Sequence, residues 1–169
     1  MLGGLDIRSV LEVGCNRGHN LLALQHLGYR VAGVEPNAYA RGIARKALLT
    51  VAGGDLYAIP YGDASFDLVF TCGVLEHVPP RLLDAALAEV VRVSRRYVLA
   101  VEYHADEDVE VVYRGKPAML WKRDYAAHYL NPCLSVRSGL RLTASGELGA
   151  EFDNARFVLL EKSSSDKSG

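Results

Sequence analysis

The segment Glu12-Val13-Gly14-Cys15-Asn16-Arg17-Gly18 decides the fold, because it joins a short apolar run to a stretch with helical spacing. The run 9–13 is typical of a buried strand, and leucines recur at helical intervals from residue 21 until Gly28. A glycine turn at such a junction lets backbone amides approach a ligand with no Cβ in the way. The same turn is also compatible with simple packing of helix on strand. The segment therefore predicts a strand, turn and helix unit with two interpretations for its glycines.

A second unit of the same kind follows directly. Residues 29–34 are predicted to form a strand, Pro36-Asn37 a turn and helix cap, and residues 38–48 a helix with its basic residues late, where they suit the helix dipole. Glu35 closes the second strand, 23 residues after Glu12. In Rossmann-type domains a carboxylate at this place binds paired ribose hydroxyls. The glycine turn and the acid thus agree in spacing with a nucleotide-like ligand.

The alternation of strands and helices continues to about residue 102. Further strands are predicted at 49–52, 66–71 and 96–102, and an amphipathic helix follows Pro79-Pro80. Residues 104–123 have no apolar period, so we expect an elaborated loop there. Asp124 can cap a short helix through residue 130, and segments 134–142 and 156–162 alternate as two closing strands do. The predicted fold is a three-layer, Rossmann-like α/β sandwich with a mostly parallel seven-stranded sheet, its last strand antiparallel.

Composition narrows the classes of partner. Half of the 169 residues are hydrophobic and 23% are charged, which excludes a disordered, collagen-like or coiled-coil chain and favours one domain over 1–162 with a disordered polar tail, 163–169. A net charge of −1 makes a nucleic-acid partner unlikely and a small molecule the expected ligand. No apolar stretch approaches the roughly 20 residues of a membrane span, and with no secretory leader we expect a cytoplasmic protein. Three scattered cysteines predict reduced thiols and no metal site.

Five pieces of sequence carry a family resemblance, in the order Glu12-x-Gly14-x-Asn16-x-Gly18, Glu35, Gly54-Asp55-Leu56, Phe66-Asp67-Leu68-Val69-Phe70 and Val74-Leu75-Glu76-His77-Val78. Over about residues 8–102 the chain resembles the class I S-adenosylmethionine-dependent methyltransferases. Asn16 replaces the middle glycine of the family pattern. Asparagine is the non-glycine residue that best tolerates positive φ, so the turn is expected to survive the replacement.

The resemblance implies S-adenosylmethionine as the cofactor and assigns residues to it. Glu12 would orient the turn, Glu35 would hold the ribose hydroxyls, and Asp55 with Leu56 would recognise the adenine edge. The complete predicted cofactor set is Glu12, Gly14, Cys15, Asn16, Gly18, Glu35, Pro36, Asp55, Leu56 and Cys72. A nicotinamide dinucleotide site shares the glycine turn and the second-strand acid, but it requires neither Gly54-Asp55 nor the Leu75–Val78 run.

Few acid-base residues are required, because the sulfonium is an activated methyl donor and the protein mainly aligns the reactants. His77 follows the fourth strand at the sheet's carboxyl edge and can accept a proton there, although helix capping or contact with the cofactor explains it equally well. Tyr103 and His104 leave the fifth strand at the same edge. These three residues are the catalytic candidates, with an exposed loop as the alternative for the last two.

A narrower resemblance covers the second half of the chain. Glu102-Tyr103-His104, Tyr113-Arg114-Gly115 and Trp121-Lys122-Arg123-Asp124-Tyr125 are similar to segments of methylases encoded with pseudaminic acid and related surface-sugar pathways. The resemblance implies a small, anionic, sugar-related methyl acceptor, because arginine and lysine bind carboxylate or phosphate. The predicted substrate set is Glu102, Arg114, Trp121, Lys122 and Arg123. The alternatives are a local Arg123-Asp124 ion pair, a solvated Lys122 and core packing for Trp121.

Two further expectations concern the completeness of the chain and the class of reaction. Only seven residues precede Arg8, whereas the resemblance implies a helical covering segment there, so we expect the chain to be truncated. Methyl transfer to oxygen or nitrogen is the predicted reaction, and a non-catalytic cofactor-binding module that needs a partner is the alternative. Nucleic-acid amino-methylation is disfavoured, because Thr71-Cys72-Gly73-Val74 stands where an N-P-P-Y or D-P-P-Y motif would.

Overall fold

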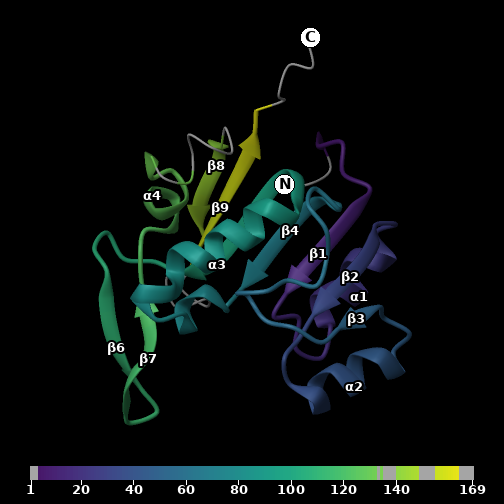
Figure 1. Cartoon of the computed structure of the whole chain (residues 1–169), viewed down its shortest axis with the longest axis horizontal. Helices are drawn as coiled ribbons and strands as arrows, with labels where there is room; N and C mark the ends of the chain where they lie inside the picture. Colours follow the sequence, from purple (N-terminus) through teal and green to yellow (C-terminus); the bar gives the residue numbers. More distant parts are fainter. Residues whose placement is uncertain (1–3, 133, 135–139, 149–154, 164–169) are drawn as a thin grey trace.

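Seven strands form one twisted sheet in the order β3-β2-β1-β4-β5-β9-β8 (Figure 1). The structure, a computed structural model, describes residues 4–132, 134, 140–148 and 155–163. The first five strands of the sheet run parallel, and β9 runs antiparallel to both of its neighbours. The predicted sheet is therefore confirmed, its last strand included. The strands are β1 (Ser9–Val13), β2 (Arg30–Val34), β3 (Val51–Ala52), β4 (Phe66–Cys72), β5 (Ser94–Tyr103), β8 (Leu140–Glu147) and β9 (Ala155–Lys162).

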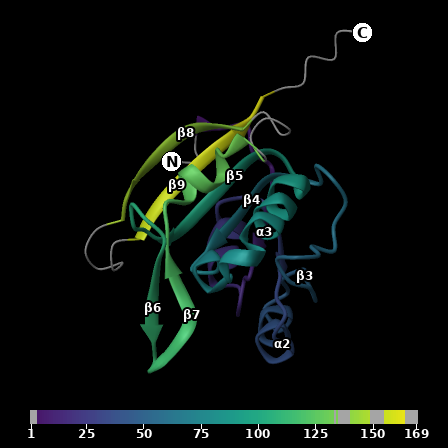
Figure 2. The same ribbon diagram turned by 60° about the vertical axis from the view of Figure 1, so that its left-hand side comes forward.

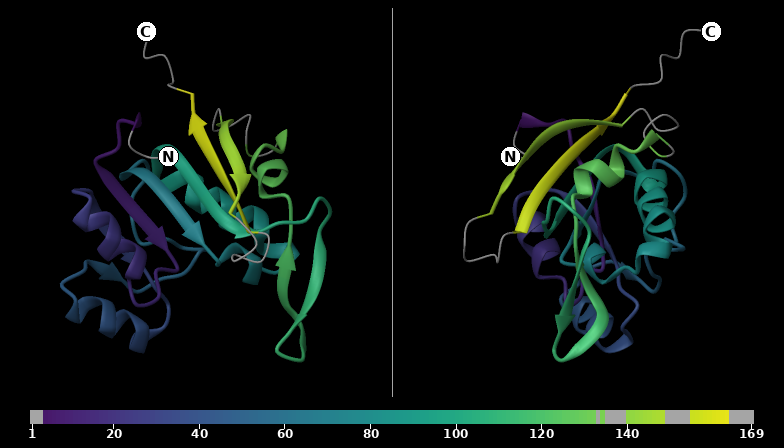
Figure 3. Two further views of the ribbon diagram at one scale, coloured as in Figure 1. Left: turned by 180° about the vertical axis from the view of Figure 1, so that it is seen from behind. Right: turned by 90° about the vertical axis from the view of Figure 1, so that its left-hand side faces the viewer.

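Helices cover both faces of this sheet and make the three layers (Figure 3). Alternate side chains of β1 show why: Leu11 and Val13 pack with α3 (Pro80–Val93), whereas Val10 lies in a second core with Leu24 of α1 (His19–His26). Adjacent residues of a strand point to opposite faces, so a buried central strand is apolar throughout. A third cluster fixes α2 (Ala38–Lys46) beside β3.

The ends of the helices follow the predicted capping signals. The Asn37 side chain accepts hydrogen bonds from the N–H groups of Tyr39 and Ala40, each at 3.0 Å, and so begins α2. Pro80 occupies the first turn of α3, where its missing N–H costs nothing. Asp124 caps α4 (Tyr125–Tyr129) by accepting from the N–H of Ala127 at 3.1 Å.

The predicted loop between residues 104 and 123 is wrong, because this segment forms a β-hairpin. Strands β6 (Val109–Tyr113) and β7 (Lys116–Lys122) pair antiparallel and project from the end of the main sheet (Figure 2). Arg114 and Gly115 form the two-residue turn, with φ of 51° and 75°. Both values are positive, as in the type I′ turns that suit the twist of a hairpin.

The closing strands agree with the prediction in part. β9 covers the predicted 156–162 strand and pairs antiparallel with β8, whereas β8 begins at Leu140 and overlaps the predicted 134–142 strand only at its end. Residues 135–139 and the tail residues 164–169 lie outside the described residues. In the part of the chain that the structure describes, no helix is long and apolar enough to cross a bilayer.

Candidate functional site

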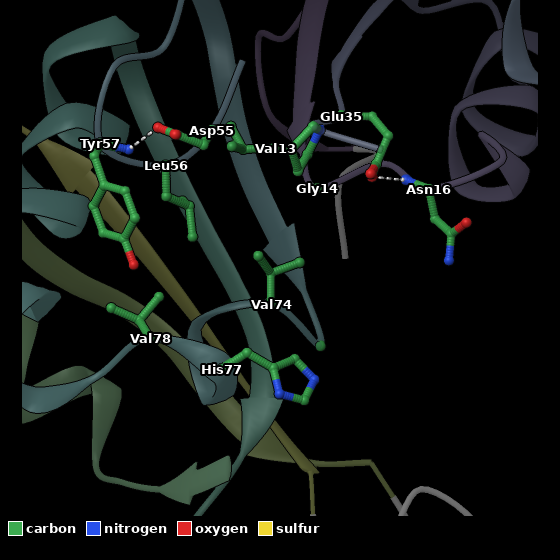
Figure 4. Close-up of a pocket in the computed structure, with 12 residues that line it drawn as sticks. Val13, Gly14, Asn16, Glu35, Asp55, Leu56, Tyr57, Val74, His77 and Val78 are labelled. Atoms are coloured by element: carbon green, nitrogen blue, oxygen red, sulfur yellow. Dashed lines mark hydrogen bonds between the residues drawn. The ribbon is translucent and has the colours of Figure 1, made fainter. Parts of the chain in front are cut away.

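A pocket of about 340 Å³ lies at the carboxyl ends of the parallel strands. The strand order reverses between β1 and β4, and open α/β sheets bind ligands at such a point. Its volume falls within the range of small-molecule sites. Figure 4 shows the lining residues, which are Val13, Gly14, Asn16, Glu35, Pro36, Asp55, Leu56, Tyr57, Gly73, Val74, His77 and Val78. Seven of them were predicted from sequence: Gly14, Asn16, Glu35, Pro36, Asp55 and Leu56 for the cofactor and His77 for catalysis.

The turn after β1 needs glycine at one position and tolerates asparagine at another. Gly14 has a φ of 79°, and a Cβ there would lie 2.6 Å from Cγ2 of Val74. Asn16 has a φ of 49°, in the left-handed region that asparagine tolerates better than other non-glycine residues. The turn keeps its conformation with asparagine at position 16, as predicted. At Gly14 no Cβ separates the backbone from the pocket.

The carboxylate of Glu35 ties the first two strand ends together. Its Oε2 accepts from the N–H of Asn16 and its Oε1 from the N–H of Asn37, both at 2.8 Å. Only 7% of the residue is exposed, yet it lines the pocket. Each carboxylate oxygen has two acceptor sites, so each can accept one further hydrogen bond, from a ligand hydroxyl.

The loop after β3 supplies one side of the pocket. Oδ1 of Asp55 accepts from the N–H of Tyr57 at 2.8 Å and of Ala58 at 3.2 Å, which orders the loop as an Asx turn. Leu56 is buried and also lines the pocket, and the Tyr57 ring lies across from it in Figure 4. The loop therefore offers an apolar wall with one carboxylate beside it.

Four predicted cofactor residues do not line the pocket. Glu12 lies buried beneath the turn, where Oε1 accepts from Nδ2 of Asn20 at 2.7 Å, and burial raises the pKa of Glu12 to about 7. Cys15 packs into the core beside α1 and α2, and burial raises its pKa. Gly18 has a φ of 82°, which favours glycine, and a Cβ there would crowd the Leu49 side chain. Cys72 is exposed at the end of β4.

The turn that follows β4 carries His77 into the pocket. This turn is the short helix η2 (Leu75–His77), and Figure 4 shows the imidazole ring beside Val74, on the side opposite Asp55. Nδ1 of His77 lies 2.8 Å from the carbonyl oxygen of Met119 in β7, and Nε2 lies 3.6 Å from Oε1 of Glu76. The Tyr113 ring packs against the imidazole, with centroids 5.8 Å apart. The hairpin thus contacts the pocket at His77.

Two buried ionisable residues, Glu102 and Arg123, hold η2 from below. Oε2 of Glu102 accepts from the N–H groups of Val74, at 2.9 Å, and Glu76, at 3.4 Å. Arg123 donates from Nη1 to the carbonyl oxygen of Leu75 at 3.2 Å and from Nη2 to that of Val78 at 2.8 Å. Burial raises the pKa of Glu102 to about 8. These contacts position the backbone that carries His77.

Three residues of the predicted substrate set, Glu102, Trp121 and Arg123, are buried in the structure. Arg123 is completely buried, and Glu102 and Trp121 are exposed by only 2% and 5%. Nε of Arg123 lies 3.3 Å from Oδ2 of Asp108, and its guanidinium lies over the Trp121 ring. These side chains contact η2 and neighbouring residues of the chain, and the substrate role stays a prediction.

The remaining predicted residues lie outside the pocket lining. Tyr103 is half-buried, with Nζ of Lys122 5.1 Å from its ring centroid. His104 lies beside Asp106, with Nε2 and Oδ1 3.1 Å apart. Arg114 is exposed at the hairpin turn. Among the described residues, no group of three or more histidine, cysteine or acidic side chains is arranged to hold a metal ion.

Sequence reasoning missed the apolar part of the lining, which consists of Val13, Tyr57, Gly73, Val74 and Val78. Gly73 and Val74 follow directly on a predicted strand, so their position at the carboxyl edge was available as a signal. The contact of Val74 with Gly14 joins two turns far apart in the chain and has no local signal.

Comparison with known proteins gives one family match, to the family described as "Methyltransferase domain", over residues 11–99. The chain is 37% identical over 103 residues to 24-methylenesterol C-methyltransferase 2 of Oryza sativa subsp. japonica, which covers 56% of the chain and 28% of that protein. The chain thus spans little more than a quarter of this curated relative.

Solved structures share the fold at low identity. A SAM-dependent methyltransferase from Methanosarcina mazei superposes with a TM-score of 0.75 at 17% identity, covering 94% of this chain and 93% of the other. A Burkholderia thailandensis 1,6-didemethyltoxoflavin-N1-methyltransferase with bound S-adenosylhomocysteine gives 0.76 at 15% identity, covering 96% and 75%. The fold is shared over nearly the whole chain, beyond the family match.

Proposed function

Because the chain belongs to the methyltransferase domain family, we propose that it transfers the methyl group of S-adenosylmethionine to oxygen or nitrogen of a small molecule. The observation that carries the proposal is the joint placement of Gly14 and Glu35 in one pocket at the reversal of strand order. A bare turn and a carboxylate with open acceptor sites suit a nucleoside ligand. Bound there, S-adenosylmethionine supplies an activated methyl group.

The residues of the pocket fit this cofactor. Gly14 leaves a space that a Cβ would fill, and Glu35 is held by two backbone N–H groups with acceptor sites to spare. Leu56 and Tyr57 offer apolar surface for an adenine ring, with Asp55 beside them. In the proposed arrangement Glu35 holds the ribose hydroxyls and the loop after β3 holds the base.

The acceptor is proposed to bind at the His77 end, between Val74 and the hairpin. Arg114 is exposed on the hairpin, so its guanidinium is accessible to an anionic group. This feature supports the proposed acceptor class, an acidic or nucleotide-linked sugar. Cys15 and Cys72 are free thiols, which supports the proposed cytoplasmic location.

Calorimetric titration with S-adenosylmethionine tests the cofactor site. Glu35→Gln removes one acceptor oxygen and keeps the shape, so affinity should fall at least tenfold. Glu107→Gln, an exposed position outside the pocket lining, is the matched control and should leave the dissociation constant unchanged. A folded wild-type chain that binds no S-adenosylmethionine would overturn the proposal.

Transfer of a radiolabelled methyl group tests the acceptor class. N-acetylneuraminic acid and UDP-N-acetylglucosamine are suitable probes, because each joins a sugar to an anionic group. Label in either product supports the proposed class, and label only in uncharged small molecules contradicts it. Saturable cofactor binding with no transfer to any acceptor favours the alternative of a binding module that needs a partner.

A further inference from the structure

A backbone atom of the hairpin makes a polar contact with a residue that lines the pocket. The carbonyl oxygen of Met119 lies 2.8 Å from Nδ1 of His77, although the two residues are 42 positions apart in the chain. The imidazole is otherwise bounded by Val74 and the Tyr113 ring, and 45% of its side chain is exposed. His77 is thus oriented by the hairpin while one edge of the ring stays open.

This contact fixes where the proton of neutral His77 resides. A carbonyl oxygen can only accept a hydrogen bond, so Nδ1 must carry the hydrogen. A neutral imidazole has one N–H, and the other nitrogen then has a lone pair. Nε2 is therefore the proton-accepting atom of the ring.

Glu76 supplies a carboxyl group close to Nε2. Oε1 of Glu76 lies 3.6 Å away, on a side chain that is 9% exposed, so a charge that forms on the ring has a carboxyl group beside it. Two further ionisable residues contact the turn that carries the ring, one from β5 and one directly after β7. Glu102 and Arg123 both form hydrogen bonds with the backbone of the η2 turn, and these bonds fix the position of His77 in the pocket.

We propose that the Met119 carbonyl fixes His77 as the Nδ1–H tautomer, and that bare Nε2 takes the proton of the methyl acceptor. The inference rests on the proposed methyl transfer. The acceptor's O–H or N–H bond breaks, its proton moves to Nε2, and the freed electron pair forms the bond to the methyl carbon. The electron pair of the breaking carbon–sulfur bond stays on sulfur, which becomes a neutral thioether. The single positive charge thus passes from the sulfonium to the imidazolium.

Nitrogen NMR of histidine-labelled protein reads the tautomer without any acceptor. The His77 signals are identified by their loss in His77→Asn, and we expect a protonated Nδ1 and an unprotonated Nε2 in the neutral form. His26 is an internal reference, because its Nδ1 also lies 2.7 Å from a carbonyl oxygen, that of Leu22. A protonated Nε2 on His77, or an even mixture of tautomers, would overturn the inference whether or not the chain is a methyltransferase.

Activity then tests the role of Nε2. In His77→Asn the side-chain amide N–H can replace Nδ1–H toward Met119, while the proton acceptor is lost. The turnover rate should fall at least 100-fold with the S-adenosylmethionine dissociation constant unchanged within threefold. The control, His26→Asn on α1, should keep the wild-type rate. A loss of less than threefold in His77→Asn contradicts the inference, whereas a wild-type chain that neither binds cofactor nor transfers methyl groups contradicts the proposed function instead.

Discussion

The turn after β1 lines the pocket and the hairpin β6–β7 contacts it at His77, and the two are built on different principles. The turn is shaped by backbone conformation, with Gly14 and Asn16 at positive φ and one carboxylate, Glu35, bound to main-chain N–H groups. The hairpin is held in place by buried polar contacts, chiefly those of Arg123, whose side chain is completely buried. Charged residues near a site therefore indicate ligand binding only when their charges remain accessible.

The largest expected effect comes from removing the buried arginine. Arg123→Met removes the side-chain donor to the carbonyl oxygen of Val78, one of two donors to that of Leu75, and one of two partners of Asp108. Breaking such a buried network should lower the free energy of unfolding by about 3 kcal/mol, measured by urea denaturation. Arg114→Met, on the same hairpin but exposed, should change it by less than about 0.5 kcal/mol. Equal effects of the two changes would contradict the distinction between the arginines.

Gly14→Ala tests the backbone principle at the turn. The added Cβ meets Val74 at 2.6 Å and requires a φ of 79°, so the turn must shift. We expect the S-adenosylmethionine affinity to fall about 100-fold in calorimetry, which is about 2.7 kcal/mol. Gly42→Ala in α2, where a Cβ meets open space, is the control and should leave affinity unchanged. Wild-type affinity in Gly14→Ala would refute the assigned importance of this turn.

Glu102→Gln tests the buried acid beneath η2 through the pH dependence of stability. Burial raises the pKa of Glu102 to about 8, from about 4.3 in an unfolded chain. Between these values the folded state holds a proton that the unfolded state has lost, so wild-type stability falls as pH rises through this window. The variant lacks this dependence, and its stability relative to wild type should increase by about 2.5 kcal/mol from pH 5 to pH 7. Parallel stability profiles would show that Glu102 is ionised in the folded protein.

The smallest effect is expected where backbone conformation alone matters. Asn16→Gly keeps the N–H group that donates to Glu35 and removes only a side chain at a φ of 49°. Stability should change by less than about 0.5 kcal/mol and cofactor affinity by less than threefold. Asn16→Val, whose branched Cβ opposes positive φ, should weaken both. If Asn16→Gly abolished binding, the asparagine side chain itself would be a ligand contact.

The first half of the chain was predictable because its signals are local. Between residues 9 and 35 the chain forms a strand, a glycine turn, a helix and a second strand that ends at an acid. Asn37 marks the start of the next helix, because its side chain accepts hydrogen bonds from the first turn. A parallel sheet then brings the strand ends to one edge without further information. Glu35 and Asp55 lie in the pocket for that reason.

The second half was less predictable, because its decisive contacts join distant residues. The hairpin itself had a signal, since Arg114-Gly115 between two β-rich runs is a two-residue turn. The buried position of Arg123 had no signal in the sequence, because its acceptors are carbonyl oxygens 48 and 45 residues earlier in the chain. Sequence shows that a residue is charged, and only tertiary structure shows whether that charge is buried.

The contact between Met119 and His77 uses a main-chain oxygen, while the methionine side chain is exposed. A carbonyl is supplied by every amino acid, so replacement of residue 119 keeps the tether to the imidazole. The side chain at position 119 can therefore be changed while the hydrogen bond that orients His77 is kept. Engineering of acceptor preference should begin there.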